Sequence, residues 1–312
     1  MQIQHTHFYR FGATCRHSTP AGLEGRRFSR GPGVGGVRSA LAGCLEPDYT
    51  NKWMANFERL LKKRSAATYE QFLLRWLKPG GTLLDCGCGN GAITVGLAAA
   101  TNARGVIGPD RERNGFHSAR DYARAHRISA LRFVAGDLFS LPFRDYSFDA
   151  APAHSVLEAV RNPLEVLREI RRVLKRGGLI GAASVHYGGL LIWPDPSGLL
   201  SGFYKLRKRW WQAAVVGWPY RGRQLRAILQ ETGYRQITTS ARYSSYGSPN
   251  EVRSFGMERA RECASGDFGN AVLELGLADE ATLGAMEDAW EKWSTAQGSF
   301  LAFGWCDAAA WK

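Results

Sequence analysis

Short apolar runs alternate with longer amphipathic stretches through the middle of the chain. The runs fit buried strands, and the stretches between them have the spacing of helices that bury one face. This alternation predicts strands at 82–86, 105–109, 130–135, 148–153 and 179–185, and helices at 91–100, 111–126 and 162–175. Strands that alternate with helices of this length form a mostly parallel sheet with helices on both faces. We therefore predict an α/β, doubly wound fold.

The pattern is less regular on both sides of this region. Upstream, apolar residues recur at helical spacing from Tyr49 to Leu77. Downstream, residues 186–198 are predicted to be a loop, because Gly188-Gly189 and Trp193-Pro194 interrupt any period. Beyond the loop, the spacing predicts helices at 199–216, 221–232, 251–263 and 279–296, and strands at 234–243 and 300–305.

Composition places the chain among globular proteins. It has 312 residues, of which 45% are hydrophobic and 22% charged, and this excludes a wholly disordered or fibrous chain. No apolar run reaches the length of about 18 residues that would predict a bilayer-spanning helix. The six cysteines are scattered, and Cys86-x-Cys88 lacks a second pair at zinc spacing. We expect free thiols in the cytoplasm and no metal site.

Positive charge is concentrated in part of the chain. The formal net charge is +13, yet residues 251–312 carry eleven acids against five bases. Residues 203–235 carry eight bases against one acid, and bases and aromatic residues occur together from Lys205 to Trp211. This segment is compatible with binding of an anionic partner such as a nucleic acid, or with a solvated basic face.

The strongest local motif is the glycine-rich segment 83–91, Leu-Leu-Asp-Cys-Gly-Cys-Gly-Asn-Gly, between a predicted strand and a predicted helix. Glycines at alternate positions permit a tight turn and a close approach of the backbone to a ligand. The N-terminus of the following helix favours an anionic group. Because Gly87-x-Gly89-x-x-Ala92 also satisfies a dinucleotide-binding pattern, the glycines alone leave the cofactor open.

Three acidic residues near the ends of predicted strands indicate which kind of cofactor binds at the glycine-rich segment. Asp85 precedes the glycines, where a carboxylate disfavours a pyrophosphate and suits an amino group. Asp110 ends the second strand, at a distance along the chain typical of an acid that binds ribose hydroxyls. Asp137 follows the third strand, where it can accept a hydrogen bond from an exocyclic amine. An amino acid joined to adenosine satisfies all three.

Residues 76–185 resemble the class I S-adenosylmethionine-dependent methyltransferases, of the kind that alkylates ubiquinone and menaquinone precursors and many small metabolites. The resemblance rests on five blocks in the family's order, namely 83–91, 105–110, 136–138, 141–149 and 167–178. It implies S-adenosyl-L-methionine as cofactor and a Rossmann-like, seven-stranded sheet with an antiparallel last strand. It also implies the cofactor-binding residues Asp85, Gly87, Cys88, Gly89 and Gly91 for the methionine part, Asp110 and Arg111 for the ribose, Asp137 and Leu138 for the adenine, and Ala153.

Composition and the resemblance together predict a domain organisation. Residues 1–46 are rich in glycine and arginine without an apolar period, so we expect a disordered basic tail, with a targeting segment or a start assigned too far upstream as the alternatives. Residues 47–312 are expected to form the methyltransferase domain. Within it, 76–185 is the cofactor half, 47–75 and 186–232 form a helical lid around the acceptor, and 233–312 supply the last helices and strands.

The sequence departs from the family in ways that affect the catalytic residues. Pro109 stands where the family has another residue, and the family's H-x-L-E-H after the fourth strand is here His154-Ser-Val-Leu-Glu-Ala. His154 is our candidate general base, because it lies at the ligand-binding edge of the sheet and its ordinary pKa suits that work. A structural histidine beside the cofactor is the alternative, and His186 is a weaker second candidate.

The acceptor side of the predicted lid is rich in aromatic residues. They are Trp53, Tyr187, Trp193, Phe203, Tyr204, Trp210, Trp211, Trp218 and Tyr220. We expect methyl transfer to an O, N or C atom of a small aromatic or lipophilic metabolite. The alternative for most of these residues is that they pack the lid on the core. A nucleic-acid methyltransferase, an NAD(P)-dependent oxidoreductase that uses the same glycine loop, and a binding protein without activity stay open as alternatives.

Overall fold

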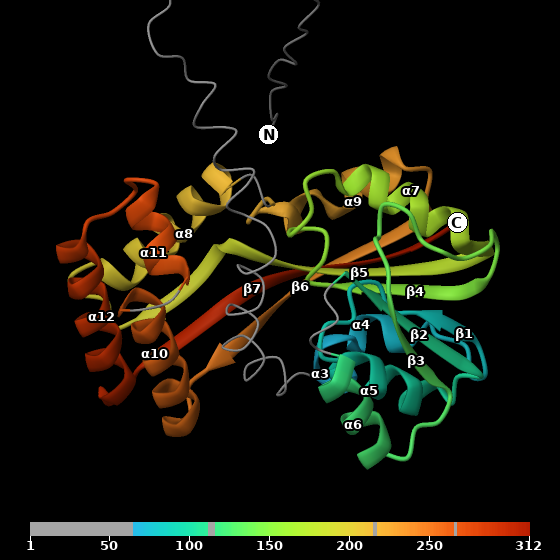
Figure 1. Cartoon of the computed structure of the whole chain (residues 1–312), viewed down its shortest axis with the longest axis horizontal. Helices are drawn as coiled ribbons and strands as arrows, with labels where there is room; N and C mark the ends of the chain where they lie inside the picture. The colour runs from blue at the N-terminus through green and yellow to red at the C-terminus, as the bar shows by residue number, and fades with distance from the viewer. Residues whose placement is uncertain (1–64, 112–115, 215–216, 265–266) are drawn as a thin grey trace, which may run out of the picture. The chain divides into compact units, whose positions relative to one another are not determined.

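The computed structural model describes residues 65–111, 116–214, 217–264 and 267–312. Within these ranges the chain forms one seven-stranded sheet with the order β3-β2-β1-β4-β5-β7-β6 (Figure 1). The predicted disordered tail and the first part of the helix predicted from Tyr49 lie outside the described residues.

The sheet is mostly parallel, as the sequence predicts. The parallel strands are β1 (Thr82–Leu84), β2 (Gly105–Asp110), β3 (Leu131–Ala135), β4 (Phe148–His154) and β5 (Leu174–Trp193). The last strand in sequence, β7 (Phe300–Trp311), lies between β5 and β6 (Arg235–Tyr246) and is antiparallel to both. The predicted α/β, Rossmann-like, seven-stranded sheet with an antiparallel last strand is therefore confirmed.

Helices follow the strands at nearly the predicted positions. Their bounds are α3 Ala66–Tyr69, α4 Gln71–Leu74, α5 Ala92–Thr101, α6 Phe116–Ala125, α7 Pro163–Val173, α8 Leu199–Ala214, η1 Arg221–Gln224, α9 Leu225–Glu231, α10 Pro249–Ala264, α11 Asp267–Glu274 and α12 Glu280–Thr295. Helix α7 shows why its bounds are predictable: Asn162 caps it, Pro163 stands in its first turn and Arg171 and Arg172 in its last. The sequence did not predict α11.

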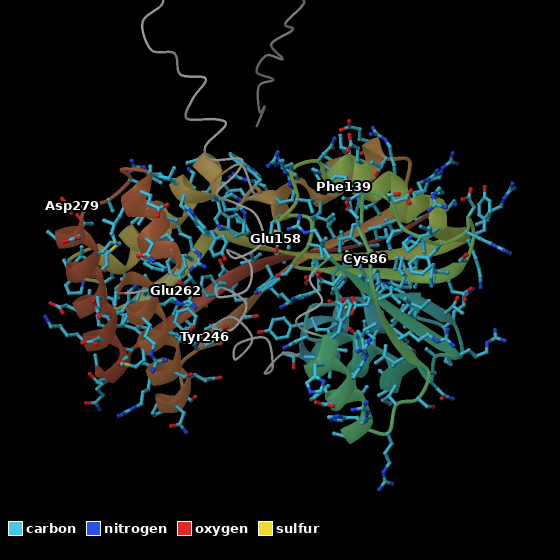
Figure 2. All side chains as sticks on the ribbon, viewed as in Figure 1. Cys86, Phe139, Glu158, Tyr246, Glu262 and Asp279 are labelled. Carbon is cyan, nitrogen blue, oxygen red and sulfur yellow. The ribbon has the colours of Figure 1, made fainter. Side chains whose placement is uncertain are left out.

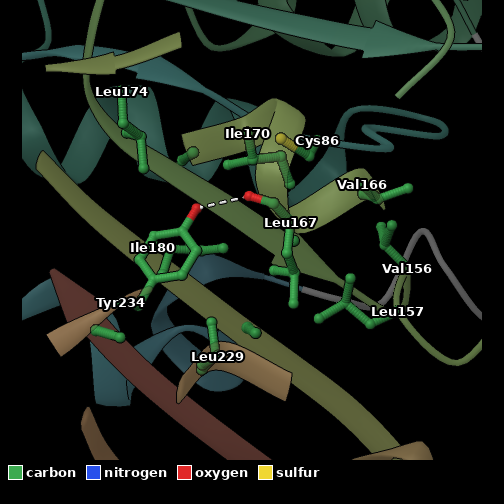
Figure 3. Close-up of a cluster of buried hydrophobic side chains, with 14 of the residues drawn as sticks. Cys86, Val156, Leu157, Val166, Leu167, Ile170, Leu174, Ile180, Leu229 and Tyr234 are labelled. Carbon is green, nitrogen blue, oxygen red and sulfur yellow. Dashed lines mark hydrogen bonds between the residues drawn. The ribbon is translucent and has the colours of Figure 1, made fainter. Parts of the chain in front are cut away.

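Apolar side chains from successive positions of each strand enter cores on opposite faces of the sheet. Leu84 and Ile180 pack with Leu167 and other residues of α7 and α9, whereas Leu83 packs with residues of α4 and α5 in a second cluster. On the first face, the Tyr234 hydroxyl donates a hydrogen bond to the carbonyl oxygen of Leu167 at 3.1 Å (Figure 3). The helices of both faces thus pack against β1, the strand that leads into the glycine motif.

One prediction about the chain after strand five is wrong. Residues 186–193, predicted to be a loop, continue β5, which pairs with β7 as far as Trp193 opposite Phe300. The register shifts between His186 and Leu191, so Gly188-Gly189 marks an irregularity within a long strand. The partner strand explains the difference, because pairing with β7 supplies the backbone hydrogen bonds that local sequence cannot reveal.

Helices α8, α10, α11 and α12 form what we call the helical lobe, at the ends of β5, β6 and β7 (Figure 1). Its core is aromatic, with Phe203, Phe268 and Trp290 almost fully buried. Ring pairs such as Phe203 with Phe268, whose centroids are 5.0 Å apart, join α8 to α11. In the parts of the chain that the structure describes, no helix is long and apolar enough to cross a bilayer.

Candidate functional site

A cavity of about 410 Å³ extends along the carboxyl edge of the parallel strands and reaches the helical lobe. It brings together nine of the predicted site residues, which are Asp85, Gly87, Cys88, Gly89, Asp110, Arg111, Asp137, Leu138 and His154. Parallel α/β sheets bind ligands at this edge. The cavity is therefore the candidate active site.

The glycine turn forms one wall of the cavity. Gly87 has φ +71° and Gly89 has φ +52°, in the left-handed region that glycine occupies without strain. A Cβ on Gly87 would lie 2.6 Å from Cγ2 of Val156, whereas the space beside Gly89 is open for 4 Å. The Gly89 amide donates a hydrogen bond to Oδ2 of Asp110 at 2.8 Å. The turn thus exposes backbone atoms to the cavity. It is also hydrogen-bonded to Asp110, the acid predicted to bind the ribose.

Pro109, a departure from the family, is accommodated in β2. Its carbonyl oxygen accepts hydrogen bonds from the amides of Gly87 at 3.0 Å and Cys88 at 3.3 Å. Proline lacks an amide proton but keeps its carbonyl acceptor. The residue therefore supports the glycine turn in spite of the substitution.

Gly91 and Ala153, both predicted to bind cofactor, are absent from the cavity wall. Gly91 precedes α5 with φ +73°, and a Cβ there would meet Ala119 and Phe133 at less than 3 Å. Ala153 lies in β4 and packs in the core beneath the sheet edge. Packing accounts for the small side chains at both positions.

The three predicted carboxylates lie around the glycine turn. Asp85 is only 2% exposed, and burial raises its pKa to about 7, although a hydrogen bond from Thr94 opposes the shift. The Asp85 and Thr94 oxygens are 2.5 Å apart. Oδ1 of Asp137 accepts a hydrogen bond from the amide of Phe139 at 2.9 Å, which fixes this exposed acid at the rim. This set fits a ligand with an amine at one end and hydroxyl groups in the middle.

His154 forms a buried pair with Glu70, a residue that the sequence analysis missed. The two side chains are 3% and 1% exposed. The imidazole stacks on Trp305 with centroids 4.8 Å apart and meets the edge of Tyr69 at 5.3 Å. Burial, followed by the charges of Asp85 and Asp307, raises the pKa of Glu70, while Arg242 opposes the rise. The imidazole is therefore held in a fixed orientation at the cavity wall.

The second candidate base, His186, is absent from the cavity wall. Its ring lies 5.4 Å from that of Tyr220. Burial and the nearby charge of Arg223 lower its pKa. Of the two histidines, the structure places only His154 with the predicted cofactor residues.

The rest of the cavity wall is aromatic, but not as predicted. Tyr187, Tyr204 and Trp211 line it, whereas Trp193 is 68% exposed, and Phe203 and Trp210 lie in the core of the lobe. Trp218 and Tyr220 contact each other away from the cavity, and Trp53 lies outside the described residues. The C-terminal part supplies wall residues that the sequence analysis missed, namely Tyr246, Phe255, Arg259, Phe303 and Trp305.

Glu158, Arg207 and Arg259 are further buried ionisable residues of the wall. Burial raises the pKa of Glu158, and its Oε2 has no hydrogen-bond partner among the described residues. Glu158 stands four positions after His154, in the motif segment His154-Ser-Val-Leu-Glu-Ala. Local sequence does not place Arg207 and Arg259 at the cavity, because their positions depend on how α8 and α10 pack.

Comparisons with known proteins show what the central part of the chain is similar to. Residues 84–181 match the family described as methyltransferase domain. An uncharacterized methyltransferase of Schizosaccharomyces pombe is 32% identical over 123 residues, which cover 38% of this chain and 44% of that protein. The 2-phytyl-1,4-naphthoquinone methyltransferase of Nostoc punctiforme is 30% identical over 141 residues, which cover 45% and 59% of the two chains. The chain thus spans about half the length of these relatives.

A solved structure also shares the fold. The YcgJ protein of Bacillus subtilis superposes with a TM-score of 0.53 at 16% identity, over 79% of this chain and 98% of that one. The matched family covers the glycine turn, β4 and α7 with the residues between them. The segment 84–181 is therefore a methyltransferase domain of the class I S-adenosylmethionine-dependent family.

Proposed function

We propose that the protein transfers a methyl group from S-adenosylmethionine to a nucleophilic atom of a small aromatic or lipophilic molecule. One observation carries the proposal: a single cavity joins the glycine turn and its carboxylates to a wall of aromatic side chains. The cofactor supplies a methyl group on a sulfonium, so the protein must mainly hold the nucleophile in line with it.

The residues of the cofactor side have distinct roles in this proposal. Asp85 pairs with the cofactor's ammonium group, and Asp110 accepts hydrogen bonds from the ribose hydroxyls. Asp137 and the backbone of Leu138 contact the adenine. Open space beside Gly89 admits the ligand close to the backbone.

His154 acts as the base when the acceptor must lose a proton. Burial raises the pKa of Glu70, and this step requires its ionised form. That carboxylate accepts a hydrogen bond from Nδ1, whose distance to Oε1 is 2.8 Å. This tautomer leaves Nε2 as the proton acceptor of the ring. Glu70 is then a positioning residue, because it holds the imidazole and selects its tautomer without reaching the acceptor itself.

An aromatic or lipophilic acceptor is supported by the wall and by the names of relatives. Tyr187, Trp211 and Phe303 present flat apolar surface to the cavity. Relatives are named for 2-phytyl-1,4-naphthoquinone and demethylmenaquinone, and both names denote lipophilic quinones. Because these relatives match only over part of their length, they support the acceptor class without assigning the compound.

The segment 205–211, which raised the possibility of nucleic-acid binding, argues against it. Leu206, Arg207 and Trp210 are buried in the helical lobe or at the cavity wall. Proteins that bind single strands stack bases on exposed aromatic rings beside exposed cations. Here the mixture of basic and aromatic residues reflects a helix that buries one face.

Two measurements test the proposal. Saturating S-adenosylhomocysteine is expected to raise the unfolding temperature by roughly 5 °C, whereas NADPH leaves it unchanged. With S-[methyl-³H]adenosylmethionine, wild type is expected to label members of a panel of hydroxylated naphthalenes. His154→Asn lowers that rate by about 100-fold at unchanged S-adenosylhomocysteine affinity. Stabilisation by NADPH alone would contradict the proposal.

A further inference from the structure

Two buried arginines lie in the part of the cavity wall that the helical lobe supplies. Arg207 on α8 is 5% exposed and Arg259 on α10 is 6% exposed, and both line the cavity. The two helices lie at the ends of β5, β6 and β7 that are farther from β1–β4 (Figure 1). The arginines are therefore on the acceptor side rather than beside the glycine turn.

One carboxylate faces both guanidinium groups. Oε2 of Glu262, which is labelled in Figure 2, is 2.7 Å from Nη1 of Arg207 and 3.1 Å from Nη1 of Arg259. The other acid of this part of α10, Glu258, pairs with Arg261 at 3.6 Å and does not line the cavity. Among the described residues, Glu262 therefore neutralises only one of the two positive charges that the arginines carry.

Buried donors in this region also lack partners. The Nε atoms of Arg207 and Arg259 and the hydroxyl of Tyr204 are buried without a hydrogen bond to any residue that the structure describes. Leaving a buried charge or donor without a partner is costly, so each such group needs an explanation, and a bound ligand is one. Guanidinium groups bind carboxylate and phosphate oxygens with paired hydrogen bonds.

The surroundings define the rest of the ligand. Tyr187, Tyr246 and Phe255 line the cavity near the arginines, and the guanidinium of Arg259 lies 5.1 Å from the ring centroid of Phe255. Aromatic walls favour a flat apolar body. The combination suits a molecule that is apolar along its length and anionic at one end.

We propose that Arg207 and Arg259 bind an anionic group, a carboxylate or a phosphate, at the end of the methyl acceptor remote from the cofactor. The inference rests on the proposed function and adds the polarity of the substrate to it. The aromatic wall holds the body of the acceptor, and the arginines fix which end enters first. They determine specificity and take no part in the transfer itself.

A purely structural role is the alternative, in which Glu262 and the arginines join α8 to α10. Such a role predicts lower stability when an arginine is removed, but no preference for anionic ligands. A comparison of charged and neutral ligands of equal shape therefore separates the two roles.

The experiment is calorimetric titration of the full chain, saturated with S-adenosylhomocysteine, with 2-naphthoate, 2-naphthamide and 2-naphthyl phosphate. The amide is the neutral counterpart of the carboxylate. We expect wild type to bind at least one of the two anions about tenfold or more tightly than the amide. The stronger anion identifies the group.

The variants assign the preference to the arginines. Arg259→Gln and Arg207→Gln are expected to reduce the preference to less than about threefold at unchanged affinity for the amide. Arg261→Gln, on the same helix but exposed and paired with Glu258, is expected to retain it. Arg259→Lys keeps the positive charge and should retain part of the preference for anions. It replaces the glutamine variants in the experiment if those do not fold.

Equal or weaker binding of both anions by wild type overturns the proposal, as does an equal preference in wild type and the folded variants. If S-adenosylhomocysteine binds and the preference is absent, the anion site fails and the methyltransferase proposal stands. If S-adenosylhomocysteine does not bind, the proposed function fails first.

Discussion

Nδ1 of His154 lies 2.8 Å from Oε1 of Glu70, a residue 84 positions earlier in the chain. His154 ends β4, and Glu70 stands between the short helices α3 and α4. The contact therefore joins the candidate base to the segment that precedes the first strand. Its fixed geometry is what the proposed proton transfer requires.

Glu70→Leu is expected to lower the free energy of unfolding by about 1–3 kcal/mol, because it leaves a buried imidazole nitrogen without its partner. Glu70→Gln retains a hydrogen-bonding group and should cost less. Urea unfolding of both variants measures the difference. A leucine variant as stable as the glutamine variant would show that the pair does not hold the imidazole.

The sequence was sufficient to predict the strands, most helices and the carboxylates near the glycine turn. These depend on local periodicity and on the rule that parallel strands place their carboxyl ends at one edge. Glu70 was not predictable in this way, since its role arises from a contact across the fold. The same holds for Arg207 and Glu262, which are 55 positions apart, and for residues 186–193, whose strand depends on β7.

Affinity for S-adenosylhomocysteine is expected to depend on the ionisation of Asp85. Burial raises the pKa of this carboxyl to about 7 in the free protein, whereas pairing with an ammonium group requires the ionised form. Below pH 7 the Asp85 carboxyl must therefore release a proton when the ligand binds. Affinity should then fall by up to about tenfold for each unit by which the pH is lowered. Calorimetry between pH 5.5 and about 8 measures the slope.

The variant Asp85→Asn should bind more weakly at pH 8 and show little dependence on pH in this range. Asp121→Asn, which changes an exposed acid on α6, should behave like wild type. Parallel slopes in wild type and Asp85→Asn would assign the pH dependence to another group.

Gly89→Ala is expected to weaken S-adenosylhomocysteine binding by tenfold or more, because its Cβ would enter the open space beside the turn. The matched control is Gly80→Ala, where φ is +72° and the surrounding space is also open, but which does not line the cavity. Both variants should lose about 1–2 kcal/mol of stability from backbone strain. Equal affinity in the two variants would contradict the role of Gly89.

Tyr234→Phe is expected to lower the free energy of unfolding by about 1 kcal/mol, because it removes the buried hydrogen bond to Leu167 (Figure 3). Tyr243→Phe removes a hydroxyl from a tyrosine that is largely exposed and should change stability by less than about 0.5 kcal/mol. Guanidinium unfolding distinguishes the two. Indistinguishable midpoints would mean that the hydrogen bond between Tyr234 and Leu167 adds little to stability.

The most direct test is a crystal structure of the protein with S-adenosylhomocysteine. We expect the amino group on Asp85, the ribose hydroxyls on Asp110, the adenine beside Asp137 and the sulfur toward the aromatic wall. Density for the ligand in another part of the molecule, or in this cavity without contacts to those acids, would contradict the assignment.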